Sequence, residues 1–146
     1  MIGRFPYRKL VKYPHMSPED IITWELFIDL FPNAFDSVDY DFPCCRVPEH
    51  TKLAIDLNIA GSERVNQYRV DVIGYQGDAV YITELKKRAT PAVLGHLKAE
   101  KLFFTRDHEN NKNVIMLLIA RDMTPELDML AKAEDIHFIL LVDKKQ

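Results

Sequence analysis

Three charged residues stand inside two apolar stretches of the chain that are separated by a short turn. Asp71 lies in the stretch 68–75 (YRVDVIGY), whereas Glu84 and Lys86 lie in the stretch 79–87 (AVYITELKK). Carboxylates are the groups that hold hard divalent cations, and an ammonium group stabilises negative charge that develops on a substrate. These residue types therefore indicate a candidate site for metal-assisted chemistry on a phosphate.

Both stretches have the composition of β-strands. They are rich in Val, Ile and Tyr, and the intervening Gln-Gly-Asp at 76–78 is a turn signal. Because side chains alternate along a strand, Glu84 and Lys86 share one face with Val80 and Ile82. The second strand thus carries its two charges on a single face.

The geometry of the turn decides which face Asp71 takes. A two-residue turn at 76–77 pairs Asp71 with Ile82, and one at 77–78 pairs it with Glu84. Both place Asp71 on the face of the other two charged residues, whereas a three-residue turn sends it to the opposite face. Asp71 and Glu84 would repel each other at the distance of a cross-strand pair, and a divalent cation between them would remove the repulsion.

Two interpretations of this charged face follow from residue types alone. It is either a solvated face of a hairpin on which Lys86 neutralises Glu84, or a site in which a divalent cation lies between Asp71 and Glu84. The sequence favours neither.

Asp71, followed after a short hairpin by Glu84-Leu85-Lys86, resembles the D…(D/E)xK signature of the PD-(D/E)xK nuclease superfamily. The resemblance implies a restriction-endonuclease-like fold and a Mg²⁺ or Mn²⁺ ion held by Asp71, Glu84 and the backbone carbonyl of Leu85. It implies a catalytic role for Lys86, which would position water or stabilise negative charge. More narrowly, the chain resembles small phage or prophage proteins of that superfamily.

The same resemblance suggests three accessory residues. A helix after the hairpin often carries Gln and Tyr in this superfamily, and this chain has His96 and Glu100 at those positions. The first helix often supplies a further acid, for which Glu25 is our candidate because it lies in an apolar sequence. An ordinary surface location is the alternative for each of the three.

The elements that must position these residues are marked by helix starts and apolar runs. Ser17-Pro18, Thr90-Pro91 and Thr124-Pro125 each combine a capping residue with proline, and predict helices. Apolar runs at 113–120 and 137–142 predict two further strands, and the first of them is expected to be central and covered on both faces. The order strand, helix, strand, helix, strand predicts an α/β fold: a mixed sheet flanked by helices on both faces.

The first two helices have wide apolar sides. We expect the first to run to about Phe31 and the second to about Arg106. The residues expected to face the sheet are Ile21, Trp24, Phe27, Leu30 and Phe31 in the first helix and Val93, Leu94, Leu97, Leu102, Phe103 and Phe104 in the second.

The remaining stretches have less regular patterns. Residues 1–16 mix aromatic and basic side chains, and we expect an arm that packs on the domain. Residues 38–42 are interpreted as a short strand in a loop whose acids, Asp36, Asp39 and Asp41, are exposed. Farther on, residues 49–58 predict a helix, or residues 53–59 equally a strand.

Composition limits the class of protein. The 146 residues are enough for one domain, 1–146, and a net charge of −3 is unlike that of a generic nucleic-acid binder, so basic side chains must cluster near any DNA site. The only two cysteines are adjacent, which disfavours a disulfide and suits a cytoplasmic location. We find no zinc motif, no signal peptide and no membrane-spanning run, and expect no membrane partner.

Together with the resemblance, these features predict a Mg²⁺- or Mn²⁺-dependent endonuclease or exonuclease that hydrolyses phosphodiester bonds. DNA is expected as the substrate on the resemblance alone. The enzyme's recognition of DNA is expected to be structure-specific rather than sequence-specific, since no base-reading motif is present. DNA is the expected partner, bound through Lys87, Arg88 and Lys98. A homodimer or a protein partner is expected on resemblance, as is the host cytoplasm if a phage encodes the chain.

The alternative comes from another functional class. A catalytically silent module with the same fold would bind nucleic acid, or serve as a phage assembly or structural protein. Such a module usually lacks one of the three site residues, and this chain has all three.

Overall fold

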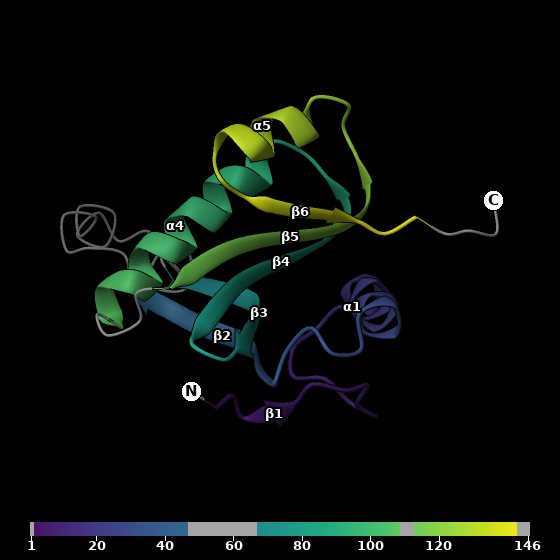
Figure 1. The fold of residues 1–146 in the computed structure, drawn as a ribbon, viewed down its shortest axis with the longest axis vertical. Coiled ribbons are helices and arrows are strands. Elements are labelled where there is room, and N and C mark those ends of the chain that lie inside the picture. Colours follow the sequence, from purple (N-terminus) through teal and green to yellow (C-terminus); the bar gives the residue numbers. More distant parts are fainter. Residues whose placement is uncertain (1, 47–66, 109–112, 143–146) are drawn as a thin grey trace, which may run out of the picture.

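The computed structural model describes residues 2–46, 67–108 and 113–142, which form a mixed β-sheet with helices on both faces (Figure 1). None of the described helices is long and apolar enough to span a membrane. In chain order the elements are β1 (Phe5–Pro6), α1 (Pro18–Leu30), β2 (Ser37–Arg46), β3 (Gln67–Gln76), β4 (Ala79–Ala89), α4 (Ala92–Asp107), β5 (Val114–Met123), α5 (Leu127–Ala133) and β6 (His137–Leu140).

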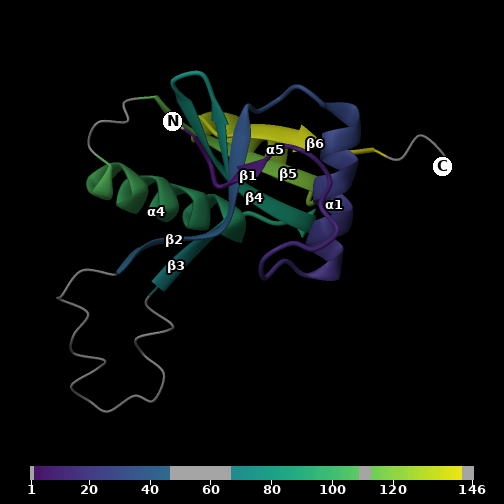
Figure 2. The ribbon, with the colours of Figure 1, turned by 90° about the horizontal axis from the view of Figure 1, so that it is seen from below.

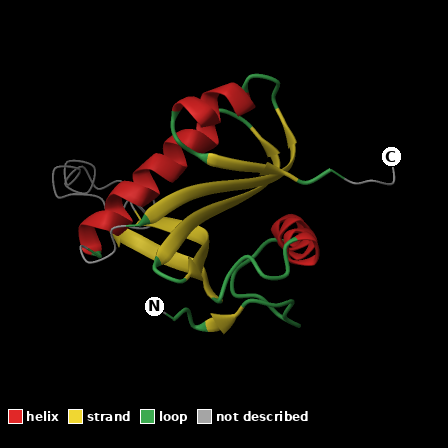
Figure 3. Cartoon of the chain, viewed as in Figure 1, coloured by secondary structure: helices red, strands yellow, loops and turns green. Residues whose placement is uncertain are grey.

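The strands lie in the sheet in the same order as in the sequence. The pairs from β1 to β4 are antiparallel, whereas β5 is parallel to β4 and β6 is parallel to β5. Helix α4 makes the crossover that a parallel β4–β5 pair requires. The mixed α/β architecture predicted from the pattern of elements is confirmed (Figure 3).

The β3–β4 hairpin has the second of the two-residue turns considered above. Gln76 pairs with Ala79, so Gly77 and Asp78 form the turn. Gly77 has a φ of +57°, a left-handed conformation that glycine adopts without strain. The last pair of this ladder is Val72 with Thr83. The next residue on each strand is Asp71 on β3 and Glu84 on β4, so the register sets these two opposite each other.

Helices cover the two faces of the sheet and create two separate apolar clusters (Figures 1 and 2). On one face α4 and α5 bury Ile73, Ile82 and Leu118 among other residues. On the other face α1 and the N-terminal arm bury Val72 and Leu85. The alternation of side chains along β3 and β4 thus divides neighbouring residues between the two clusters.

Helix α1 begins as the sequence predicts. The Ser17 hydroxyl caps it by accepting a hydrogen bond from the Asp20 amide at 3.2 Å. Trp24 and Phe27 are buried as expected, but Leu30 and Phe31 are 49% and 41% exposed, contrary to our prediction. Leu30 is the last residue of the helix and Phe31 its C-cap, so both lie at the end of α1, beyond its last buried residue, Ile28.

Helix α4 also departs in one place from its predicted apolar side. Leu102 is 66% exposed, whereas Glu100 is buried at 2% exposure. The face of α4 that packs on the sheet therefore includes the carboxylate of Glu100, which a prediction based on apolar residues alone would place on the surface. In α5 only Leu127 and Ala131 are buried.

The N-terminal arm packs against α1 and β2, as expected. Its short strand β1 pairs with β2, and Tyr13 is buried in the apolar cluster that lies between α1 and the sheet. Asp39 is buried rather than exposed as predicted, because it accepts hydrogen bonds from the Tyr75 hydroxyl at 2.7 Å and the Arg4 amide at 2.9 Å. The helix or strand expected within residues 49–59 lies outside the described residues.

Candidate active site

The candidate site lies where the sheet opens between β3 and β4. Their ladder ends at the pair Val72–Thr83; beyond it β3 continues beside β2 and β4 continues beside β5. Asp71 and Glu84 are the first residues past this end. Both side chains therefore lie at a fork in the sheet, where backbone groups are left without ladder partners.

Asp71 satisfies one of these backbone groups. The amide of Leu85 donates a hydrogen bond to Asp71 Oδ2 at 2.9 Å, in the place of a ladder bond. The Asp71 carboxylate is thereby held against β4, beside Glu84. A side chain with a fixed rotamer suits a binding site better than a freely rotating one.

Glu84 links Asp71 to a third carboxyl group that comes from α4. Its side chain is 6% exposed and forms hydrogen bonds with both Asp71 and Glu100. Two carboxyl groups can hydrogen-bond to each other only when one of them carries a proton, so this row of three acids disfavours the fully charged form.

Burial and mutual proximity raise the pKa values of Asp71 and Glu84. Burial, followed by the charge of Glu84 and the hydrogen bond to it, raises the pKa of Asp71 to about 8. Burial and the hydrogen bond to Glu100 raise the pKa of Glu84 well above its ordinary value. Lys86 favours the charged form of both acids, but both pKa values stay raised, so its single charge offsets only part of the cost.

Lys86 follows Glu84 by two residues and is exposed. Its charge acts on Asp71, on Glu84 and on Asp20 of α1, which places the ammonium group in the electrostatic field of all three acids. The hairpin therefore brings together Asp71, Glu84 and Lys86, as the sequence predicted. Their roles in metal binding and catalysis remain proposals.

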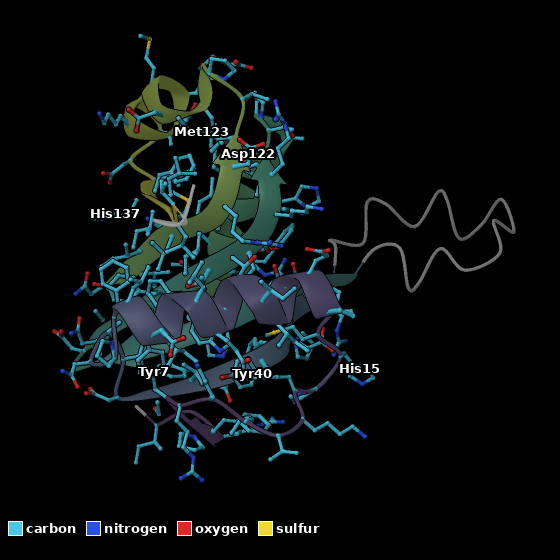
Figure 4. All side chains as sticks on the ribbon, turned by 90° about the vertical axis from the view of Figure 1, so that its right-hand side faces the viewer. Tyr7, His15, Tyr40, Asp122, Met123 and His137 are labelled. Carbon is cyan, nitrogen blue, oxygen red and sulfur yellow. The ribbon has the colours of Figure 1, made fainter. Side chains whose placement is uncertain are left out.

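Asp20 is a site residue that our sequence reasoning did not select. It lines a small pocket with Asp71, His15 and Asp41. Burial raises the pKa of Asp20 most, and the charge of Asp71 raises it further. Figure 4 shows His15 beside the end of α1 at which that helix begins. The capping-box position of Asp20 was the available signal, since it places the acid at the first turn of α1.

Glu25, the acid that we had selected on α1, lies among other groups. It accepts a hydrogen bond from the Tyr13 hydroxyl at 2.8 Å, and its charge acts on Lys9 and Tyr40. The helix turns by about 100° per residue, so two acids five positions apart point in different directions. The structure thus brings Asp20, and not Glu25, next to Asp71.

Some of the other residues predicted for the site lie in it, whereas others lie on the exposed surface. Of the two candidates on α4, Glu100 is buried against Glu84, whereas His96 is exposed. The three cationic residues predicted to bind nucleic acid are exposed and form surface ion pairs, which contribute little to stability and leave a cationic group accessible to solvent. These pairs are Lys87 with Glu19, Arg88 with Asp122, and Lys98 with Glu134.

The carboxylates of Asp71 and Glu84 fit a hard divalent cation that needs few protein ligands. Asp71 and Glu84 offer carboxylate oxygens whose like charges destabilise one another, so a cation would stabilise both. Within residues 2–46, 67–108 and 113–142, no group of three or more His, Cys, Asp or Glu side chains is arranged to hold a metal ion. The fit is therefore to an ion such as Mg²⁺, which takes one or two carboxylates and keeps several waters.

The comparison with solved structures found chains that are similar to this one. EndoMS in a complex with double-stranded DNA has a TM-score of 0.51 and 19% identity to this chain, and the match covers 95% of this chain and 51% of that one. A repair endonuclease from Pyrococcus abyssi matches 51% of this chain and 33% of its own, at a TM-score of 0.44 and 28% identity. The chain thus spans about half the length of the EndoMS chain, and shares its fold.

Sequence comparisons add no family. No protein-family model matches the chain. No curated protein matches it either.

Proposed function

We propose that this chain is a metal-dependent deoxyribonuclease of the PD-(D/E)xK type. One observation carries the proposal: Asp71 and Glu84 lie side by side at the fork of the sheet, with Lys86 on the same strand and exposed. Two buried carboxyl groups with raised pKa values and a neighbouring cation are typical of a functional site rather than of a solvated surface.

Asp71, Glu84 and the backbone carbonyl of Leu85 would hold Mg²⁺ or Mn²⁺. When bound, the ion would polarise the scissile phosphate and lower the pKa of a coordinated water. The Leu85 amide fixes Asp71 in its position, and Glu100 fixes Glu84. These partners orient the two carboxylates before substrate arrives, as an efficient metal site requires.

Lys86 would act on the substrate directly. Its ammonium group is exposed at the end of the site, where it can donate hydrogen bonds to phosphate oxygens and stabilise the negative charge of the transition state. Asp20 would hydrogen-bond water on the α1 side of Asp71, where the two acids line one pocket.

DNA is the substrate that we propose to test first. The fold is shared with EndoMS, which has been solved with double-stranded DNA, and this likeness supports the choice. Lys87, Arg88 and Lys98 would contact backbone phosphates without reading bases, consistent with recognition of DNA structure rather than sequence.

Incubation with supercoiled, linear, single-stranded and branched DNA, in Mg²⁺, Mn²⁺ or chelator, tests the proposal. We expect metal-dependent cleavage by the parent, and a loss of at least about 100-fold for Asp71→Asn and Glu84→Gln, because each removes one charged ligand. Asp128→Asn, on the exposed surface of α5, is the matched control and should cleave like the parent.

Either of two results would overturn the proposal. Cleavage that survives both site variants would show that other residues, or a contaminating nuclease, perform it. A parent that neither cleaves any substrate nor binds metal would favour the catalytically silent module with the same fold.

A further inference from the structure

Arg121, on β5, reaches across the sheet surface to the first turn of α1. Its Nε donates to Thr23 Oγ1 at 3.0 Å, and its Nη2 donates to the Glu19 backbone oxygen at 3.5 Å. The same Nη2 forms an ion pair with the Glu19 carboxylate. One guanidinium group thus binds two side chains and one backbone carbonyl of a single helical turn, and we name this set of contacts the α1 clamp.

The partners of Arg121 are themselves fixed. Thr23 is fully buried, and its hydroxyl donates to the Glu19 backbone oxygen at 3.1 Å while it accepts from Arg121. Lys87 adds a second cation 3.9 Å from the Glu19 carboxylate. Because Lys86 lies beside Ala120 and Arg88 beside Asp122, Lys87 and Arg121 are neighbours on the α1 face.

The clamped turn carries Asp20 into the candidate site. Asp20 follows Glu19 directly, lines the pocket with Asp71, and experiences the charges of Asp71, Lys86 and Arg121. Glu19 and Thr23 lie on the side of the turn that faces Arg121, and no other cation contacts them as closely among the described residues.

We propose that Arg121 is a positioning residue of the nuclease: it holds the first turn of α1 so that the Asp20 carboxylate stays beside Asp71. The inference rests on the proposed function for its kinetic consequence, but the placement of Asp20 is independent of activity. Arg121 acts through Asp20 and does not contact the substrate. A displacement of about 1 Å in a catalytic group lowers rates by up to about 100-fold, so this support matters for turnover.

Crystal structures of the metal-free parent, Arg121→Met and Glu19→Gln proteins test the placement. Methionine keeps most of the length of arginine without its donors. Glu19→Gln, which removes the ion pair from the other side, is the second variant in case Arg121→Met folds poorly. We expect Asp20 to leave the pocket it shares with Asp71 while β3, β4 and α4 stay in place. Asp29→Asn, which breaks an ion pair at the other end of α1, is the control and should leave Asp20 in position.

Kinetics with DNA and Mg²⁺ test the consequence. We expect Arg121→Met to lower kcat about 10- to 100-fold with little change in KM. Because Arg121 acts through Asp20, a protein that carries both Asp20→Asn and Arg121→Met should be no slower than Asp20→Asn alone. A raised KM with an unchanged kcat would instead show a direct contact with DNA.

Three results would overturn the inference: Asp20 in its original place in both crystal structures, a parental kcat for Arg121→Met, or losses that multiply in the double variant. A parent that does not cleave DNA would overturn the proposed function instead. In that case the crystal structures alone decide whether Arg121 places Asp20.

Discussion

At the scale of single residues, the chemistry depends on carboxyl groups that are placed against each other and away from water. Asp71 and Glu84 are hydrogen-bonded, and Glu100 extends the row from α4. An isolated surface carboxylate is charged at neutral pH, whereas burial and like charge raise the pKa values of Asp71 and Glu84. The same arrangement that destabilises the charged row would favour a divalent cation.

This arrangement makes the stability of the metal-free protein depend on pH. The pKa of Asp71 is about 8 in the folded chain and about 4 when unfolded, so the folded state binds more protons between these values. The free energy of unfolding therefore falls as pH rises from about 4 to about 8, by at most about 1.4 kcal/mol per pH unit for one carboxyl.

We expect Asp71→Asn to flatten this dependence, since an amide does not titrate and its oxygen can still accept from Leu85. Urea unfolding at pH 5, 6 and 7 in chelator measures it. Asp128→Asn, an exposed acid on α5, should keep the parental slope. An Asp71→Asn protein with the parental slope would show that Asp71 is not the group with the raised pKa.

At the scale of elements, a cluster of aromatic side chains packs between α1 and strand β3. The packing of Phe35 against Gly74 of β3 sets the distance between the helix and the sheet. Phe35 is 7% exposed and lies against Gly74, while its ring also contacts Trp24, Phe27 and Tyr7. A Cβ atom on Gly74 would lie 2.4 Å from Phe35 Cε1. Figure 4 shows Tyr7 and Tyr40 below α1.

Gly74→Ala should therefore destabilise the protein by about 1–3 kcal/mol, because the Phe35 ring must move within a packed cluster. Gly95→Ala is the matched control: it lies in α4 with nothing within 4 Å of its Cβ position. Alanine there should stabilise the helix by about 0.5–1 kcal/mol. Chemical denaturation measures both changes, and equal effects of the two substitutions would contradict the packing argument.

At the scale of the whole molecule, the site lies between two separately packed halves. Asp71 and Glu84 belong to the sheet, Asp20 comes from α1 on one face, and Glu100 comes from α4 on the other. A cation at this place would be bound by elements that come together only in the folded chain. Its binding would therefore stabilise the folded state as a whole.

We expect Mg²⁺ to raise the Tm, and to raise it more at pH 8 than at pH 5. At a concentration about ten times its Kd, a ligand adds about 1.4 kcal/mol, which raises the Tm by about 3–6 °C for a chain of this size. Protons compete for the same carboxylates, so the gain should nearly vanish at pH 5. Thermal unfolding in Mg²⁺ or chelator measures it, and an Mg²⁺ effect that persists in Glu84→Gln would contradict the assignment.

The sequence by itself determined the features that depend on neighbouring residues. The strands around Asp71 and Glu84, the turn at Gly77 and the capped start of α1 follow from periodicity, turn chemistry and capping, which act over a few residues. The face shared by Glu84 and Lys86 follows in the same way. The order of these elements was also enough for the mixed α/β architecture.

Only the tertiary structure decided how distant elements complete the site. The two turn alternatives were equivalent in sequence, and the register selected the one that sets Asp71 opposite Glu84. The choice of Asp20 over Glu25, and the burial of Glu100, depend on how α1 and α4 rotate about their own axes when they pack. That rotation is set by contacts between residues far apart in the chain, which no local pattern records.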